Sequence, residues 1–354
     1  MIIDKIRVLI TDDSLLFRNV LKKELSKDSI IEVVGMAVDP IDAMDKIKTL
    51  KPDIITLDIE MPKMDGLTFL KKLMLEQPTK VVLVSSMNIS VFDALNLGAV
   101  DFVKKPDMSL ESDLQSFIKE LITKIKVASI AKIVTNRMST NQEKSKSDIS
   151  IKDNSRIIKS SITKIIAIGA STGGTEATLK ILKELPVNMP PILITQHMPP
   201  GFTKMYADRL NRICNIEVRE AADGDRLSQG VAMIAPGDKQ MELNIDEKGY
   251  YVTCRKGERV NGHCPSVDVL FNSVAENAGE KSVGIILTGM GRDGAAGLLN
   301  MKKAGAYTIG QDEKTSVVYG MPMVAYNIGA VMAQAPINDI SDILLNHLNS
   351  PIIL

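Results

Sequence analysis

The stretch Lys164–Gly174 reads KIIAIGASTGG, an apolar run of strand type that passes directly into a serine among glycines. Further apolar runs follow, separated by helix-like stretches: PILITQ from residue 191, SVGIILTG from residue 282 and AYTIGQ from residue 306. Strand-like and helix-like segments that alternate in this way indicate a doubly wound α/β domain with a mainly parallel sheet. Ser171 is therefore predicted at the carboxyl end of the first strand of this domain, where ligand sites of such sheets lie.

The turn GASTGG supports two interpretations. It could cradle a phosphate with backbone N–H groups at a helix N-terminus. However, no lysine follows the glycines, and Ser171 stands where the dinucleotide pattern GxGxxG has its second glycine. Gly169 to Gly173 instead fits GxSxG, in which small neighbours let a serine stand exposed on a sharp strand-to-helix turn. The loop taken alone leaves a nucleophile and a nucleotide cradle both open.

A nucleophilic serine needs a base, and the chain has three histidines. His197 follows PILITQ directly, so it emerges at the same sheet edge as Ser171 if their strands are neighbours. His263, in VNGHCPSVDVLF, could line a site, whereas His347 near the end of the chain is expected to be a solvated or packed helix residue. A lone histidine after a strand is often only structural, so His197 as the base depends on its pairing with Ser171.

The third member of such a site is a carboxylate that orients the imidazole and stabilises its cation. Asp293 lies in SVGIILTGMGRDGAAG, after an apolar strand and within a glycine-rich loop. Its alternative role is to cap the following helix. The chain order Ser, His, Asp differs from the Ser, Asp, His order of α/β-hydrolases, which disfavours that common fold.

The first part of the chain also alternates strand-like runs (IRVLIT, IEVVGMA, DIITLD, KVVLVSS, DFVKK) with helix-like stretches. The predicted strand ends carry Asp12 and Asp13, Asp58, Ser85 and Lys105. Three carboxylates at one edge repel one another unless a cation neutralises them, and oxygen ligands of this kind suit Mg²⁺. A carboxylate can also accept a phosphoryl group, and Asp58 is the candidate. Taken singly, an aspartate at such a position more often caps a helix.

Length and composition predict two α/β domains, which we place at residues 1–125 and 161–354, joined by a flexible polar linker at 126–160 that lacks glycine, proline and aromatic residues. Lysine plus arginine equals aspartate plus glutamate at 43 each, so no basic field predicts nucleic-acid binding. Three cysteines without paired spacing favour reduced thiols and a cytoplasmic location. No segment is apolar enough for direct membrane insertion, and the N-terminal run contains charges.

Residues 4–125 closely resemble the receiver domain of response regulators, through the motifs VLITDDS, DIITLDIEMPKMDG, LVSS and DFVKKP. The resemblance implies a flavodoxin-like five-stranded parallel sheet and phosphorylation of Asp58 by a chemotaxis histidine kinase. It also implies Mg²⁺ held by Asp12, Asp13 and Asp58, with Ser85 and Lys105 sensing the phosphate. The Lys105–Pro106 bond is a candidate cis peptide, because only a bond before proline adopts cis cheaply.

GASTGG, TQHMP, PSVDVLF and LTGMGRDGA closely resemble the motifs of the catalytic domain of chemotaxis protein-glutamate methylesterases, over about residues 164–349. The resemblance implies a triad of Ser171, His197 and Asp293, with the backbone N–H groups of Thr172 and Met290 as the oxyanion hole. The implied reaction is hydrolysis of glutamate γ-methyl esters on chemoreceptor cytoplasmic helices, together with deamidation of receptor glutamines. It needs no cofactor beyond the Mg²⁺ of the receiver.

One position departs from that family pattern, because Cys264 stands where an arginine is expected. No substrate contact is therefore carried over to it. Two rival functions belong to other classes: a receiver with a DNA-binding output, and a binding module that uses GASTGG for a phosphate or nucleotide. The first is disfavoured by the α/β pattern and the absence of a basic helix-turn-helix signature. The second would make the placing of His197 and Asp293 a coincidence.

Overall fold

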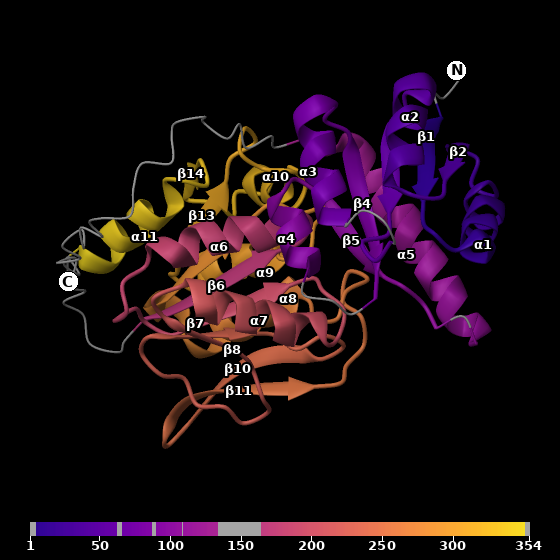
Figure 1. Cartoon of the computed structure of the whole chain (residues 1–354). Helices are drawn as coiled ribbons and strands as arrows, with labels where there is room; N and C mark the ends of the chain where they lie inside the picture. The colour runs from indigo at the N-terminus through magenta and orange to yellow at the C-terminus, as the bar shows by residue number, and fades with distance from the viewer. Residues whose placement is uncertain (1–4, 62–65, 87–89, 108, 134–163, 351–354) are drawn as a thin grey trace. The chain divides into compact units, whose positions relative to one another are not determined.

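The computed structural model describes residues 5–61, 66–86, 90–107, 109–133 and 164–350, in two compact units that divide between residues 136 and 137 (Figure 1). Among the described residues, no helix combines the length and apolar character needed to cross a membrane.

The first unit is built on a five-stranded parallel sheet, as predicted, and its strand order is β2-β1-β3-β4-β5. Its strands are β1 (Ile6–Thr11), β2 (Ile31–Ala37), β3 (Ile54–Leu57), β4 (Lys80–Ser85) and β5 (Asp101–Lys104). The middle strand β3 is buried along its whole length, which is typical of a parallel sheet covered on both faces. The carboxyl ends of β1 and β3 therefore meet at the centre of one sheet edge.

Five helices cover this sheet: α1 (Leu15–Leu25), α2 (Pro40–Leu50), α3 (Gly66–Glu76), α4 (Ser90–Asn96) and α5 (Glu111–Ile130). α1 packs beside α5, while α3 packs beside both α2 and α4, so the helices divide between the two faces. The helix starts follow local chemistry. Ser14 caps α1 by accepting from the Phe17 N–H, and Asp39 caps α2, whose first residue is a proline.

The second unit contains a seven-stranded sheet in the order β14-β13-β12-β6-β7-β9-β8, with every neighbouring pair parallel. The strands are β6 (Ile165–Ala170), β7 (Ile192–Gln196), β8 (Glu217–Glu220), β9 (Val231–Ile234), β12 (Ser282–Ile286), β13 (Tyr307–Gln311) and β14 (Ala333–Ala335). The strands β6, β7 and β12 are buried throughout. The predicted doubly wound, mainly parallel fold is confirmed.

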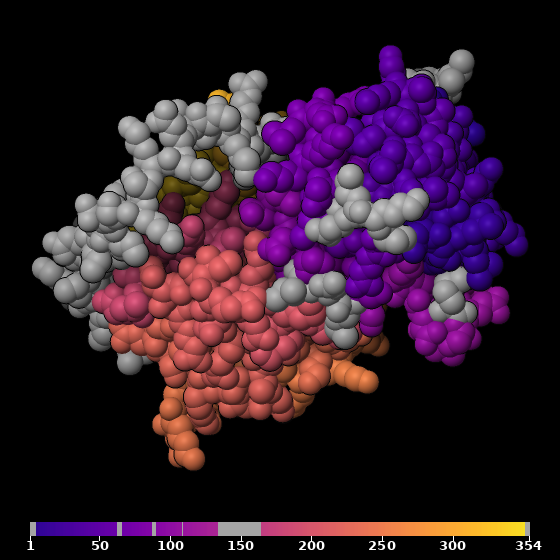
Figure 2. Space-filling model, in the orientation of Figure 1, coloured from indigo at the N-terminus to yellow at the C-terminus, as the bar shows by residue number. Residues whose placement is uncertain are grey.

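An antiparallel hairpin of β10 (Gln240–Asp246) and β11 (Gly249–Arg255) is added to this sheet domain and packs against α8. Its exposed tip, residues 245–248, stands out from the surface of the second unit in Figure 2, where it is orange. The chain returns from this hairpin to α8 through residues 256–266.

The second unit's helices also cover two faces. They are α6 (Gly174–Glu184), α7 (Phe202–Ile213), α8 (Val267–Asn277), α9 (Ala295–Lys303), α10 (Met321–Asn327) and α11 (Ile340–Asn349), with a short 3₁₀ turn at Gly279–Lys281. α6 packs beside α7 and α11, and in Figure 1 α6 and α7 lie in front of β6 and β7. α9 packs beside α8 and α10.

The predicted domain limits at 125 and 161 stay a prediction. α5 continues past residue 125 to Ile130, and most of the predicted linker lies outside the described residues.

Gly169 shows how closely α8 approaches the central strand of the second sheet. A Cβ at this position would lie 2.1 Å from Cγ1 of Val267, the first residue of α8. Two non-bonded carbon atoms cannot approach so closely, so either β6 or α8, both buried here, would have to move. The glycine at the start of GASTGG is therefore required for packing, separately from any chemistry at Ser171.

We expect Gly169→Ala to lower the free energy of unfolding of the second unit by about 1–3 kcal/mol, as overpacking of cores does. The measurement is urea unfolding of the full chain. Trimming the opposing side chain supplies the control. Gly169→Ala with Val267→Ala should lose less stability than the two single variants added together, by about 0.5–3 kcal/mol. Strictly additive losses would contradict the contact.

Candidate active site

The three predicted site residues follow three neighbouring strands of the second sheet. β6 pairs with β12 on one side and with β7 on the other, all in parallel. Ser171 follows β6, His197 follows β7, and Asp293 lies in the loop between β12 and α9. The condition placed on His197, that its strand should neighbour that of Ser171, is met.

The structure joins two of these residues directly. Nε2 of His197 lies 2.8 Å from Oδ2 of Asp293, and both side chains are buried, with 6% and 1% exposed. Asp293 also accepts hydrogen bonds from Ser266 Oγ at 2.7 Å and from the N–H groups of Val267 at 2.7 Å and Asp268 at 3.2 Å. The carboxylate therefore sits at the positive N-terminal end of α8, where an anion is stabilised.

This placement differs from the alternative in which Asp293 caps the helix that follows it. α9 has Gly294 at its N-cap position and receives no side-chain cap, whereas Asp293 accepts from the first amides of α8. Burial alone would raise the pKa of Asp293, but the hydrogen bond and charge of His197 and the bonds from Asn261 and Ser266 outweigh it. The pKa is held well below its usual range, so Asp293 is an anion at every physiological pH.

The ionised Asp293 decides which nitrogen of His197 carries the proton. A carboxylate only accepts hydrogen bonds, so the neutral imidazole must donate from Nε2. Nδ1 then holds the lone pair. Nδ1 is buried, and no described residue forms a hydrogen bond with it. A buried polar atom without a partner calls for an explanation, and a base awaiting a proton provides one.

The turn at Ser171 is held rigidly at its backbone. The Ser171 N–H donates to Thr288 O at 3.0 Å, and its carbonyl accepts from Gly174 N–H at 2.7 Å. Gly173 has φ +77°, in the left-handed region that glycine adopts without strain. Gly289, in the loop after β12, approaches so closely that a Cβ there would lie 2.7 Å from the Cβ of Ser171.

The two residues predicted to form an oxyanion hole lie on the turns around Ser171. Thr172 is 4% exposed, and its carbonyl accepts from Thr288 Oγ1 at 3.0 Å. Met290 follows Gly289, and its side chain is exposed. Both backbones thus come from turns that the packing around Ser171 fixes, while their role as oxyanion donors stays a prediction.

Two further residues touch this site. Gln196 Nε2 donates to the carbonyl of Ser171 at 2.9 Å and to that of His197 at 3.3 Å, so it ties the two turns together. The His263 ring stacks on the ring of His197, with centroids 3.6 Å apart and planes 8° from parallel. From the sequence we expected that His263 could line a site. We predicted no role for Gln196, which is the glutamine of the TQHMP motif.

His347 is the third histidine, and Cys264 is the residue that differs from the family pattern. His347 stacks on Tyr307 and contacts Lys164, so it is a packed helix residue, as expected. Cys264, next to His263, is half-buried and not in a disulfide. Burial raises the pKa of its thiol above the ordinary value, which keeps it protonated at neutral pH.

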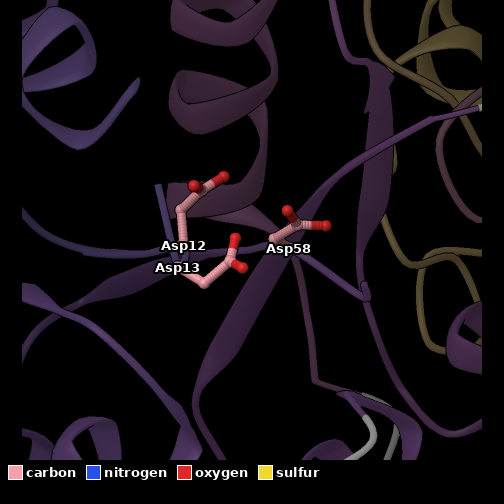
Figure 3. Close-up of side chains that lie close together, drawn as sticks. All are labelled: Asp12, Asp13 and Asp58. Carbon is pink, nitrogen blue, oxygen red and sulfur yellow. The ribbon is translucent and has the colours of Figure 1, made fainter. Parts of the chain in front are cut away.

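The first unit brings its five predicted residues to one sheet edge. Asp12 and Asp13 follow β1 and Asp58 follows β3, and Figure 3 shows the Asp13 carboxylate turned toward Asp58. The Lys105 ammonium lies 2.8 Å from Asp12 Oδ2 and 2.7 Å from Asp58 Oδ2. Ser85 is fully buried at the end of β4, and its hydroxyl has no hydrogen-bond partner among the described residues.

These carboxylates could hold a divalent cation. One oxygen from each of Asp12, Asp13 and Asp58 lies within 4.8 Å of the others. Burial, and to a lesser extent the charge of Asp12, raises the pKa of Asp58 despite the hydrogen bond from Lys105. Burial alone would lower the pKa of Lys105, but its bonds to Asp12 and Asp58 raise it, so the lysine stays charged. The all-oxygen set suits Mg²⁺.

One expectation at this edge is wrong. The Lys105–Pro106 bond is not cis, and the cis peptide found among the described residues is Cys264–Pro265.

Comparison with known proteins covers both units. The CheB methylesterase family matches residues 166–344, and the response regulator receiver domain matches residues 8–118. A protein-glutamate methylesterase/protein-glutamine glutaminase of Syntrophomonas wolfei is 53% identical over 350 residues, 98% of each chain. The Escherichia coli K12 protein of the same name is 45% identical over 350 residues, again 98% of each chain. The crystal structure of the Thermotoga maritima CheB methylesterase catalytic domain is 37% identical with a TM-score of 0.51, and the match covers 52% of this chain and 98% of that one.

The tautomer of His197 can be measured, because the chain has three histidines and their ¹⁵N signals can be assigned by substitution. In ¹⁵N-histidine-labelled protein above neutral pH, we expect His197 to show a protonated Nε2 and an unprotonated Nδ1. Asp293→Ala should abolish this preference, while His347→Gln, distant in sequence, should only remove its own signals. A protonated Nδ1 in the unaltered protein would contradict the hydrogen-bonding argument.

Proposed function

The chain belongs to the CheB methylesterase family and carries a response-regulator receiver domain, and on that basis we propose that Ser171, His197 and Asp293 form its catalytic triad. The chain is a protein-glutamate methylesterase and protein-glutamine glutaminase under receiver control. The observation that carries the triad is the 2.8 Å contact between His197 Nε2 and a carboxylate held at a helix N-terminus, which leaves Nδ1 as the base.

The proposed chemistry is acyl transfer in two steps. Ser171 Oγ attacks the γ-carbonyl carbon of a methylated receptor glutamate, and its proton passes to Nδ1 of His197. The carbon–methoxy bond breaks, the same proton goes to the leaving oxygen, and methanol departs from a γ-glutamyl ester of Ser171. Water then attacks with Nδ1 as base, the ester bond to Ser171 breaks, and the hydroxyl regains its proton. With glutamine, ammonia leaves in place of methanol.

Each remaining group has a defined part in this scheme. Asp293 stabilises the imidazolium that forms when Nδ1 takes a proton, and its low pKa keeps it from accepting that proton itself. The N–H groups of Thr172 and Met290 receive the oxyanion. Loss of one such donor typically costs about 10²–10³ in rate, so the turns around Ser171 matter nearly as much as the triad.

We expect Ser171→Ala to lower methanol release from methylated receptor fragments by roughly 10⁴-fold or more, since triad nucleophiles contribute on that scale. The assay is run on the folded full chain. Ser282→Ala serves as the control. Ser282 is the first residue of β12, at the end of that strand away from the site, and its buried hydroxyl donates to Gly279 O. Full esterase activity in a folded Ser171→Ala protein would overturn the assignment.

In the receiver, Asp58 is the proposed phosphoacceptor and a chemotaxis histidine kinase the phosphodonor. Asp12, Asp13 and Asp58 would hold Mg²⁺, which when bound neutralises charge on the carboxylates and the phosphoryl oxygens. Lys105 reaches Asp58 at 2.7 Å and so stands ready to pair with a phosphate there. The buried hydroxyl of Ser85, at the end of the adjacent strand, is the second proposed phosphate ligand.

We further propose that the unphosphorylated receiver blocks access of the receptor helix to Ser171 and that phosphorylation releases it. The family suggests chemoreceptor helices as the partner of this enzyme. The balanced charge of the chain disfavours nucleic-acid binding, and its free cysteines favour a cytoplasmic location.

Acetyl phosphate with Mg²⁺ should raise methanol release by the full chain and leave an Asp58→Asn variant unchanged, since the asparagine cannot be phosphorylated. Asp107→Asn, an exposed change in the same unit, should respond like the unaltered protein. A chain that begins at Ser161, once shown to fold, should exceed the unphosphorylated full chain in activity. Equal activity of those two chains would count against blocking by the receiver.

A further inference from the structure

The loop that returns from β11 to α8 forms a tight two-residue hairpin beside the triad. Val260 and His263 exchange two backbone hydrogen bonds, at 3.0 and 2.9 Å. The residues between them, Asn261 and Gly262, both have positive φ, at +53° and +86°. Two central residues of positive φ define a type I′ turn, for which Asn-Gly is the preferred pair. The turn presents the His263 ring to the face of His197.

The side chain of Asn261 does more than permit the turn. Its Nδ2 donates to Oδ2 of Asp268 at 2.7 Å and to Oδ1 of Asp293 at 3.0 Å. An amide NH₂ has two hydrogens, so each carboxylate can receive one. Asp268 in turn accepts from the Gly297 N–H of α9 at 2.6 Å. One asparagine thus bridges the carboxylate that orients His197 to a second carboxylate that ties α8 to α9.

The electrostatics explain why a donor is needed at this point. Asp268 and Asp293 are both buried, at 7% and 1% exposed. Burial first, and then the negative charge of Asp293, raises the pKa of Asp268. Two buried carboxylates that face each other without an intervening donor repel, and the weaker acid takes up a proton or moves away. Either response would disturb the position of Asp293.

We propose that Asn261 is a positioning residue for catalysis, whose amide separates Asp268 from Asp293 and holds Asp293 in line with Nε2 of His197. This inference rests on the proposed triad. Asn261 touches no reacting atom, and it acts through Asp293. The competing explanation is that Asn261 merely shapes the turn.

Substitution by glycine separates the two explanations. Glycine adopts positive φ freely, so Asn261→Gly keeps the type I′ turn and the stacked His263 while removing the amide. Asn261→Asp also tolerates this backbone but replaces the donor with a third carboxylate. Asn244→Ala is the matched control, because it removes an asparagine amide with two hydrogen bonds, to Glu242 O and Thr253 Oγ1, in the β10–β11 hairpin.

The experiment measures methanol release by the full chain, thermal unfolding and the ¹⁵N signals of His197, with Ser171→Ala in parallel. We expect Asn261→Gly to lower kcat by about 10- to 100-fold with KM within about twofold, because misplacement of a catalytic group by about 1 Å can cost about 10²-fold. Asn261→Asp should lose more, the His197 Nε2 signal should shift in both variants, and Asn244→Ala should match the unaltered protein.

Two outcomes would overturn the inference. One is a kcat for Asn261→Gly within about twofold of the unaltered protein, which is well under one tenfold step in transition-state stabilisation. The other is a loss that simply follows the unfolded fraction, with the His197 signals of the folded protein unchanged. The parallel arm separates this inference from the function it rests on. A fully active Ser171→Ala would refute the triad itself, whereas an inactive Ser171→Ala beside a normal Asn261→Gly would refute only the role of Asn261.

Discussion

The hydrogen bond between His197 Nε2 and Asp293 Oδ2 is the interaction on which the rest of the catalytic unit depends. It requires a buried carboxylate that stays charged, which is costly in a protein interior unless donors surround it. Here the first amides of α8, the hydroxyl of Ser266 and the amide of Asn261 donate hydrogen bonds to the carboxylate and offset its desolvation. The anion then fixes the imidazole tautomer, and this tautomer leaves the lone pair on Nδ1, the proposed base.

Sheet order supplies the rest of the geometry. With β6 between β12 and β7, the serine stands on the middle strand, and its two partners arrive from either side. α8 must lie close against β6 for its N-terminus to reach Asp293, and Gly169 makes that approach sterically feasible. The same glycine that opens the GxSxG turn thus also permits the packing that brings the N-terminus of α8 to Asp293.

Much of the fold and of the site could be predicted because the residues that follow parallel strands meet at one edge of the sheet. The apolar runs located the five strands of the first sheet and β6, β7, β12 and β13 of the second, but not β8, β9 or β14. The polar residues that follow these runs located Ser171, His197 and the acidic cluster around Asp58. The partners from the β11–α8 loop could not be found in this way. Asn261 and His263 reach the site through a hairpin that the sheet pattern does not describe. Asp293 accepts hydrogen bonds from the N-terminus of α8 and does not cap α9, which depends on tertiary packing. The ring nitrogen that faces Asp293 is likewise a result of rotamer choice, which sequence does not encode locally.

The most direct test of the central claim is covalent labelling by a phosphonate analogue of a glutamate γ-methyl ester, because its adduct is stable and does not depend on the rate of deacylation. Peptide mass spectrometry should find one phosphonyl group per inactivated chain, on Ser171, and labelling should fall steeply in a His197→Gln variant. Inactivation that tracks labelling of another residue, such as the free thiol of Cys264, would contradict the account.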